Sequence, residues 1–182
     1  MSLAEALTYE QWLRMPEVRD AVEEVVAGEV RISPVSEWRH ALIINRVYHQ
    51  LAPQIDGPDV MVISSPLGLV IRRSPLTVRV PDLTVFKKDT MVVEDGYVHS
   101  APQLAVEVIS RSDTPSTIAD KLADYAALGV PEAWVVSPEA RTVEVLYLED
   151  SRLHRVQLLA EGILTPRHFP GVHVDIAEIW PE

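Results

Sequence analysis

The chain has 182 residues, 47 % of them hydrophobic, and a formal net charge of −11, so it can bury one sizeable core but is acidic overall. It has no cysteine, which excludes a disulfide framework and a thiolate metal site. No stretch approaches the roughly 18 apolar residues of a membrane span, and the first residues lack the basic and apolar segments of a signal peptide. We therefore expect one domain, residues 1–182, in the cytoplasm and without a membrane partner.

The N-terminal elements are predicted to be a short helix and a β-hairpin. Thr8 is a favourable N-cap for a helix through Trp12 that ends near Pro16. Residues 22–32, interrupted at Gly28, have the pattern of a hairpin. We expect the helix and the hairpin to be additions to a core domain.

A longer helix and several strands follow. Ser36 is a candidate cap for a helix that Pro53 ends, and its apolar stripe should pack across a sheet (Leu42, Ile43, Val47 and Leu51). Strands are expected over residues 59–63, 67–72, 80–86, 103–110 and, after a helix closed by Gly129, 133–136.

The C-terminal part alternates in polarity over residues 142–147 and 154–158, with a turn at 149–151, which predicts a half-exposed antiparallel hairpin. The order of elements is that of an α+β domain. The chain has no GxxxxGK[ST], GxGxxG, HExxH or GxSxG motif, so the commonest nucleotide-binding, zinc-protease and serine-hydrolase interpretations are removed.

Glu107 is the most unusual residue of the predicted strands. The run from Leu104 to Ile109 is apolar on both faces apart from Glu107, which is typical of a buried central strand. A lone ionised carboxylate there costs several kcal/mol unless it is paired, bound to a metal or protonated, so its presence indicates a site. The alternative is a structural ion pair, with Arg79 or Arg111 as the partner.

Two further ionisable residues complete a candidate site. Asp82 opens an apolar strand, and Lys121 lies beside the apolar stripe of the helix that follows Glu107. Two carboxylates and an ammonium are what a magnesium-dependent phosphodiester hydrolase needs, because carboxylates ligate a hard cation and the ammonium positions or activates water. Lys121 could instead be a surface residue paired with Asp124 or Thr117.

The order and spacing of several short segments resemble the Uma-two family, a large bacterial group described as endonucleases. The resemblance extends over nearly the whole chain and rests on these residues: Val25-Val26-Ala27-Gly28-Glu29-Val30, Ser33-Pro34, His40, Pro81-Asp82, Val106-Glu107-Val108-Ile109-Ser110, Lys121-Leu122-Ala123-Asp124-Tyr125, Gly129-Val130 and Glu132-Ala133-Trp134-Val135-Val136. It implies a restriction-endonuclease-like PD-(D/E)XK core, in which a mixed central sheet is flanked by helices, with an added N-terminal helix and hairpin and an added C-terminal hairpin.

The resemblance also implies roles for individual residues. In the wider superfamily a lysine lies two residues after the acidic residue, where this chain has Ile109, so the resemblance moves that role to Lys121. Asp82 and Glu107 would ligate Mg²⁺, for which Mn²⁺ can substitute. His40 and Glu29 match the family pattern as candidate substrate-binding residues, although a plain helix histidine and an edge-strand carboxylate are as compatible with the sequence.

The charge distribution bears on a nucleic-acid partner. Phosphate binding depends on Lys and Arg, yet the acidic excess lies toward the chain ends: residues 72–121 contain seven basic and seven acidic residues. Four of these basic residues could line a groove near the carboxylates, or could simply solubilise strand edges: Arg72, Arg73, Lys87 and Lys88.

These observations predict a metal-dependent endonuclease that hydrolyses DNA. A module that keeps the nuclease fold but only binds DNA or protein is the main alternative, and RNA or a nucleotide is another conceivable substrate. An exposed sheet edge would allow a homodimer.

Overall fold

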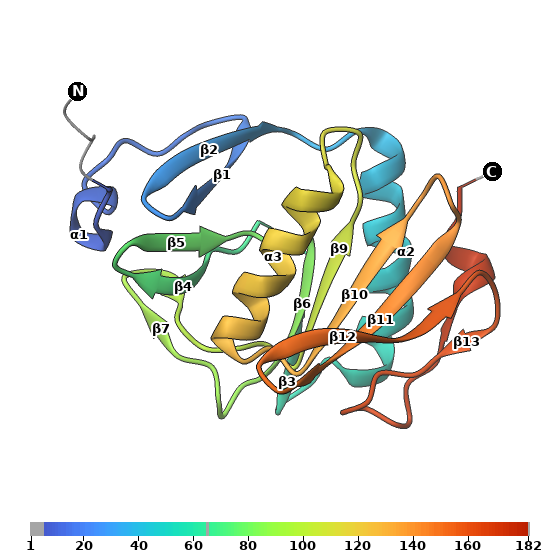
Figure 1. Cartoon of the computed structure of the whole chain (residues 1–182). Helices are drawn as coiled ribbons and strands as arrows, with labels where there is room; N and C mark the ends of the chain where they lie inside the picture. Colours follow the sequence, from blue (N-terminus) through green and yellow to red (C-terminus); the bar gives the residue numbers. More distant parts are fainter. Residues whose placement is uncertain (1–5, 65, 182) are drawn as a thin grey trace.

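Within residues 6–64 and 66–181, which the computed structural model describes, the chain forms two six-stranded sheets and two long helices (Figure 1). The α+β class is therefore confirmed. One mixed sheet was expected, and the second sheet is a finding of the structure. None of the helices described is both long and apolar enough to span a membrane.

The central sheet has the strand order β12-β11-β10-β9-β6-β3 and contains β3 (Val60–Ile63), β6 (Leu83–Lys87), β9 (Leu104–Val108), β10 (Glu132–Ser137), β11 (Thr142–Glu149) and β12 (Arg152–Leu159). Only the β9–β10 pair is parallel among the described pairs of this sheet. A parallel pair needs a crossover, and helix α3 (Pro115–Leu128) supplies it. The predicted C-terminal hairpin, β11–β12, is confirmed, and it continues the central sheet beyond β10.

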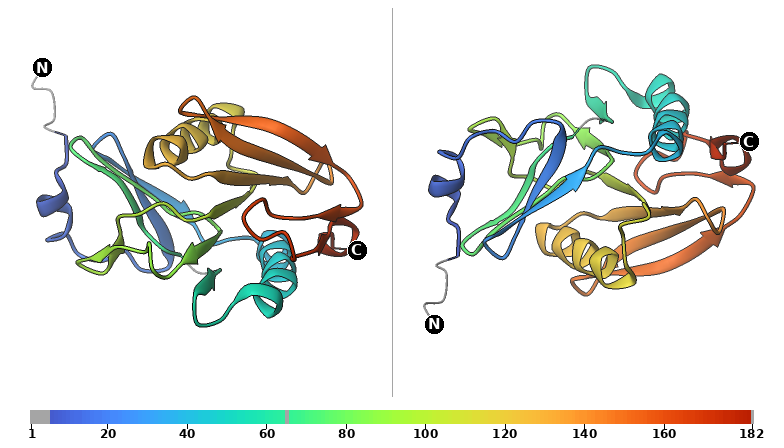
Figure 2. Two further views of the ribbon diagram at one scale, coloured as in Figure 1. Left: turned by 90° about the horizontal axis from the view of Figure 1, so that it is seen from below. Right: turned by 90° about the horizontal axis from the view of Figure 1, so that it is seen from above.

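Helix α2 (Trp38–Ile55) and helix α3 cover opposite faces of the central sheet (Figure 2). The residues of α2 that face the sheet pack on one side of β9 with Leu104, Val106 and Val108. On the other side of β9, Ala105 packs with Tyr125 of α3. The period of two along β9 therefore directs Glu107 toward α3.

Two predictions about α2 are wrong. Its N-cap is Glu37 rather than Ser36, and no side chain caps it. Pro53 lies inside the last turn instead of ending the helix. Burial of Leu51 and Ala52 against the sheet outweighs the one hydrogen bond that a proline removes, and the Asp56 N–H donates to the Ala52 carbonyl to close the turn.

The second sheet has the order β2-β1-β5-β4-β8-β7 and contains β1 (Ala21–Val26), β2 (Glu29–Pro34), β4 (Leu69–Arg73), β5 (Leu76–Arg79), β7 (Val93–Glu94) and β8 (Tyr97–Val98). Strand β5 was not predicted, and the strand expected over residues 80–86 begins only at Leu83. Pro81 has no N–H for a ladder, so Val80, Pro81 and Asp82 form the link between the two sheets.

The predicted N-terminal helix and hairpin are both confirmed. Helix α1 (Tyr9–Trp12) starts at Thr8, whose side chain accepts from the Gln11 N–H. The hairpin turns at Ala27 and Gly28, which have φ values of 51° and 84°, a backbone that a tight two-residue turn requires. Helix α1 packs on this hairpin, and the Trp12 Nε1–H donates to Glu23 at 2.6 Å.

The last residues pack on the α2 side of the central sheet. They form β13 (Ile163–Leu164), β14 (Val174–Asp175) and the 3-10 helix η1 (Ile176–Ile179). The Gln50 side chain of α2 accepts from the Asp175 N–H and donates to its carbonyl, which fixes the segment to the helix.

Candidate active site

Glu107 is buried in the centre of the fold, with 4 % of its surface exposed. The Lys121 Nζ donates to its Oε2 at 2.9 Å, and the Tyr125 hydroxyl donates to its Oε1. In the described part of the chain, neither Arg79 nor Arg111 is paired with Glu107. The prediction that Arg79 or Arg111 forms an ion pair with Glu107 is therefore wrong, and the buried carboxylate is paired with Lys121.

The spacing of Lys121 and Tyr125 explains this geometry. The two residues are four apart, so they lie one above the other on the face of α3 that covers β9. Thr117 lies one turn earlier in α3. Its side chain accepts the Thr114 N–H and the Thr114 side chain accepts the Thr117 N–H, so the two residues form a capping box at the start of the helix. Asp124 binds Arg79, so the surface pairing considered for Lys121 is not formed with either residue.

Burial and the charges of neighbouring side chains together set the ionisation of this cluster. Burial raises the pKa of Glu107 from 4.5 to about 7, an effect that the charge of Lys121 opposes and that of Asp82 reinforces. Burial alone would lower the pKa of Lys121, but the carboxylates of Glu107 and Glu24 outweigh it and raise that pKa. Burial, followed by the charge of Glu107, raises the pKa of Tyr125 well above its ordinary value. At neutral pH, Lys121 is thus a cation and Tyr125 a hydrogen-bond donor.

Asp82 and His40 approach the same end of β9. The Asp82 Oδ2 accepts the Val108 N–H at 2.7 Å, directly beside Glu107 in the chain. The His40 Nε2 lies 2.8 Å from the Val108 carbonyl oxygen and 3.3 Å from the Asp82 Oδ2. Both neighbours are acceptors, so Nε2 carries a proton.

The charge state of His40 follows from the same neighbours. Burial lowers the pKa of its imidazole, but the hydrogen bond and charge of Asp82 outweigh burial and raise it. Its Nδ1 is buried and has no hydrogen-bond partner among residues 6–64 and 66–181.

The structure thus brings Asp82, Glu107, Lys121 and His40 together, but it separates the other residues that the sequence suggested. Glu29 is exposed at the start of β2. Lys87 ends β6 five residues after Asp82, about 17 Å along an extended strand.

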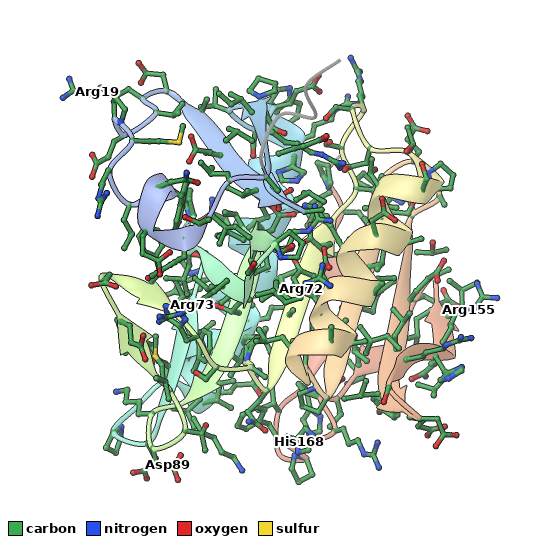
Figure 3. All side chains as sticks on the ribbon, turned by 60° about the vertical axis from the view of Figure 1, so that its left-hand side comes forward. Arg19, Arg72, Arg73, Asp89, Arg155 and His168 are labelled. Atoms are coloured by element: carbon green, nitrogen blue, oxygen red, sulfur yellow. The ribbon has the colours of Figure 1, made fainter. Side chains whose placement is uncertain are left out.

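Lys88 donates to the Gly57 carbonyl. Figure 3 shows the next residue, Asp89, at the lower edge of the molecule, far from Arg72, which lies beside α3. The expectation that Lys87 and Lys88 flank the carboxylates is therefore wrong, because they stand at the opposite end of the strand.

Glu24 of β1 is a member of the cluster that the sequence analysis missed. Its Oε1 lies 3.6 Å from the Lys121 Nζ and accepts the Val80 N–H at 3.0 Å. Its Oε2 lies 3.2 Å from Arg79. The available signal was the Glu23-Glu24 pair in an otherwise apolar strand, since adjacent residues of a strand face opposite sides and one of the two must point inward.

Asp82 is the most exposed of the three carboxylates in the cluster. Its side chain is 21 % exposed, and it borders a hollow of about 200 Å³ between β1, α2 and the link before β6. The hollow is lined mainly by neutral residues, among them Val22, Ala41, Asn45 and Pro81.

The donor set offers oxygen atoms, which a hard cation prefers. Asp82, Glu107 and the Val108 carbonyl supply them, and each Glu107 oxygen accepts one hydrogen bond from α3 and keeps a second lone pair. The described residues contain no group of three or more His, Asp or Glu side chains placed to hold a metal. A cation here would therefore depend on two carboxylates, on main-chain oxygen and on water.

Comparisons with known proteins agree with this architecture. A family model described as "Uma2: Putative restriction endonuclease" matches residues 8–177. The crystal structure of a putative nuclease belonging to DUF820, from Anabaena variabilis ATCC 29413, is similar with a TM-score of 0.74 and 18 % sequence identity. The similarity covers 96 % of this chain and 97 % of that one. No match was found among curated proteins.

Proposed function

Because the chain belongs to the Uma2 family, which is described as putative restriction endonucleases and shares a nuclease fold, we propose that it is a metal-dependent endonuclease that hydrolyses DNA phosphodiester bonds. The observation that supports this best is the burial of Glu107 between Lys121 and Tyr125 with Asp82 beside it. Several buried charges that meet at one end of a strand are costly for a purely structural purpose.

Asp82 and Glu107 would hold Mg²⁺, or Mn²⁺ in its place, since both supply the oxygen ligands that hard cations prefer. When bound, such an ion supplies Lewis-acid stabilisation of a phosphoryl oxygen and a more acidic water. The protein's own contribution is electrostatic. The Lys121 ammonium would stabilise negative charge that develops on the phosphoryl group, and Glu107 and Glu24 keep it protonated at neutral pH.

The second candidate is a nuclease-fold module that binds DNA or protein without cleavage. It is favoured by the contacts of Glu107, since each of its two oxygens already accepts a hydrogen bond from the protein. The two candidates differ in whether the carboxylates take up a cation.

A paired experiment separates these two functions. We expect Mn²⁺ to raise the melting temperature of the wild type, and Mg²⁺ to support nicking of supercoiled plasmid. Asp82→Asn, Glu107→Gln and Lys121→Met should each lower the nicking rate at least about a hundredfold, because each removes a group that acts on the transition state. Lys88→Met, which removes an exposed lysine far from the cluster, should keep the wild-type rate.

The two carboxylate variants should also lose the Mn²⁺ shift. A wild type that shows neither a metal shift nor metal-dependent nicking, in preparations free of contaminating nucleases, would leave the binding module as the function. Single-stranded DNA and RNA, offered in parallel, identify the preferred substrate.

A further inference from the structure

Consecutive ion pairs form a continuous network from the central sheet to the second sheet, in which acidic and basic side chains alternate. The members, in order, are Glu107, Lys121, Glu24, Arg79, Asp124 and Arg72. Three of the six are acidic and three are basic, so the formal charges of this network cancel. It joins β9, α3, β1, β5 and β4, and Figure 3 shows its outer end, Arg72, beside α3.

Glu24 is the central anion of this network and is held by three contacts. Its two oxygens meet the Val80 N–H, the Arg79 guanidinium and the Lys121 ammonium. Its side chain is 12 % exposed. The adjacent Glu23 points to the other face of β1, where it accepts from Trp12. Of these two glutamates, therefore, Glu24 alone can act on the site.

Lys121 needs a second anion to stay in place. Its four-carbon side chain is flexible and 16 % exposed, so a single carboxylate that is also a candidate metal ligand is a weak restraint on the ammonium. If Glu107 ligates a cation, its share in holding Lys121 falls. Glu24, which Arg79 and the Val80 N–H hold in place, then remains beside the ammonium.

We propose that Glu24 is a positioning residue of the candidate active site, which holds the Lys121 ammonium beside Glu107. The proposal rests on the proposed nuclease function for its meaning in catalysis. The restraint on Lys121, however, can be measured without any cleavage.

The first test observes the Lys121 ammonium in the metal-free protein by ¹⁵N NMR. Ammonium protons held by carboxylates exchange slowly with water, so the wild type should give a Lys121 Nζ–H signal, assigned by its loss in Lys121→Met. Glu24→Gln keeps the shape of the side chain and removes its charge, and it should abolish the signal or speed its exchange at least about tenfold. Glu23→Gln removes an equal charge from the other face of β1 and should leave the signal unchanged.

Retention of the wild-type signal in Glu24→Gln would overturn the proposal. If that variant does not fold, Glu24→Asp, which keeps the charge but shortens the reach, replaces it: faster exchange supports the proposal, and wild-type exchange overturns it.

Cleavage provides the second test. Glu24→Gln should lower kcat about tenfold or more with KM unchanged, and Glu24→Asp should recover part of the loss, because only the charge at Lys121 is restored. A change in KM with kcat unchanged would overturn the proposal. So would an equal fall of kcat in Glu23→Gln, because it would mean that the loss is structural. If the wild type does not cleave at all, the proposed function fails, whereas the NMR comparison still decides the role of Glu24.

Discussion

At the scale of single residues, the contribution of Glu107 to stability depends on its burial and on the neighbouring charge of Lys121. The folded protein binds a proton at Glu107 more tightly than the unfolded chain does, because burial raises its pKa from 4.5 to about 7. A raised pKa means that stability from this group is fully present below pH 4.5 and is lost as pH rises through about 7. Lys121 limits that loss, since its charge opposes the effect of burial.

Removal of Lys121 gives a prediction with a defined sign. Lys121→Met should raise the pKa of Glu107 above 7, measured by ¹³C NMR titration of the carboxyl group. The free energy of unfolding should fall by about 3 kcal/mol at pH 8, where folding must either bury an unpaired carboxylate or bind a proton, and by clearly less at pH 5, where Glu107 holds a proton in both proteins. Lys87→Met, an exposed lysine at the far end of β6, is the control. An unchanged Glu107 midpoint in Lys121→Met would show that the two residues do not interact.

At the scale of elements, β1 and α3 are held together through the buried Arg79 of β5. Its side chain is 2 % exposed, and it contacts Glu24 of β1 and Asp124 of α3. Burial by itself would lower the pKa of Arg79, but the charge of Glu24, followed by the hydrogen bond to Asp124, raises it, so this guanidinium is charged. The second sheet is therefore attached to α3 by ion pairs as well as by apolar contacts.

Two arginines that both reach Asp124 provide a matched comparison. Arg79→Met should lower the free energy of unfolding by about 3 kcal/mol, because it leaves the partly buried carboxylates of Glu24 and Asp124 without their cation. Arg72→Met should change it by less than about 1 kcal/mol, since Arg72 is 52 % exposed and solvent screens its pair at 3.8 Å. Urea unfolding of both variants measures the difference. Equal effects would mean that the buried pairs do not carry the sheet-to-helix connection.

At the scale of the whole molecule, several basic residues near the site already contact other side chains of the protein. Arg79 is buried, Arg72 contacts Asp124, and Arg73 is paired with Glu94 and stacked on Tyr9. With a formal net charge of −11, few cations are left for phosphate groups. A homodimer, which could join basic residues of two subunits, stays a prediction.

The salt dependence of DNA binding tests this reading of the surface. Each phosphate neutralised contributes about −0.9 to the slope of log K against log salt, so we expect a slope shallower than about −2. Fluorescence anisotropy with a labelled duplex between low and physiological salt measures it. A slope near −6 would show an extensive cationic surface, contrary to this description.

Some features of the protein followed from the sequence by itself. The period of two along residues 104–109 predicted the burial of Glu107, and the hairpins and α3 were found where polarity and Gly129 indicated them. Such features depend on neighbours along the chain. The role suggested for Lys121 came from a family resemblance, and the four-residue spacing to Tyr125 is consistent with its contact.

Only the tertiary structure decided which distant residues join Glu107. Glu24 rather than Glu29 reaches the cluster. Glu29 pairs with Val26 and so lies on the same face of the hairpin as Glu24, but it stands beside the turn on the exposed edge strand β2, whereas β1 lies next to β5 and brings Glu24 to Arg79 and Lys121. Lys87 lies far from Asp82 because β6 runs straight between them. The positions of Glu24, Glu29 and Lys87 relative to the cluster depend on how the two sheets are placed around α3. That arrangement is set by contacts among residues far apart in the sequence, and no local sequence pattern contains it.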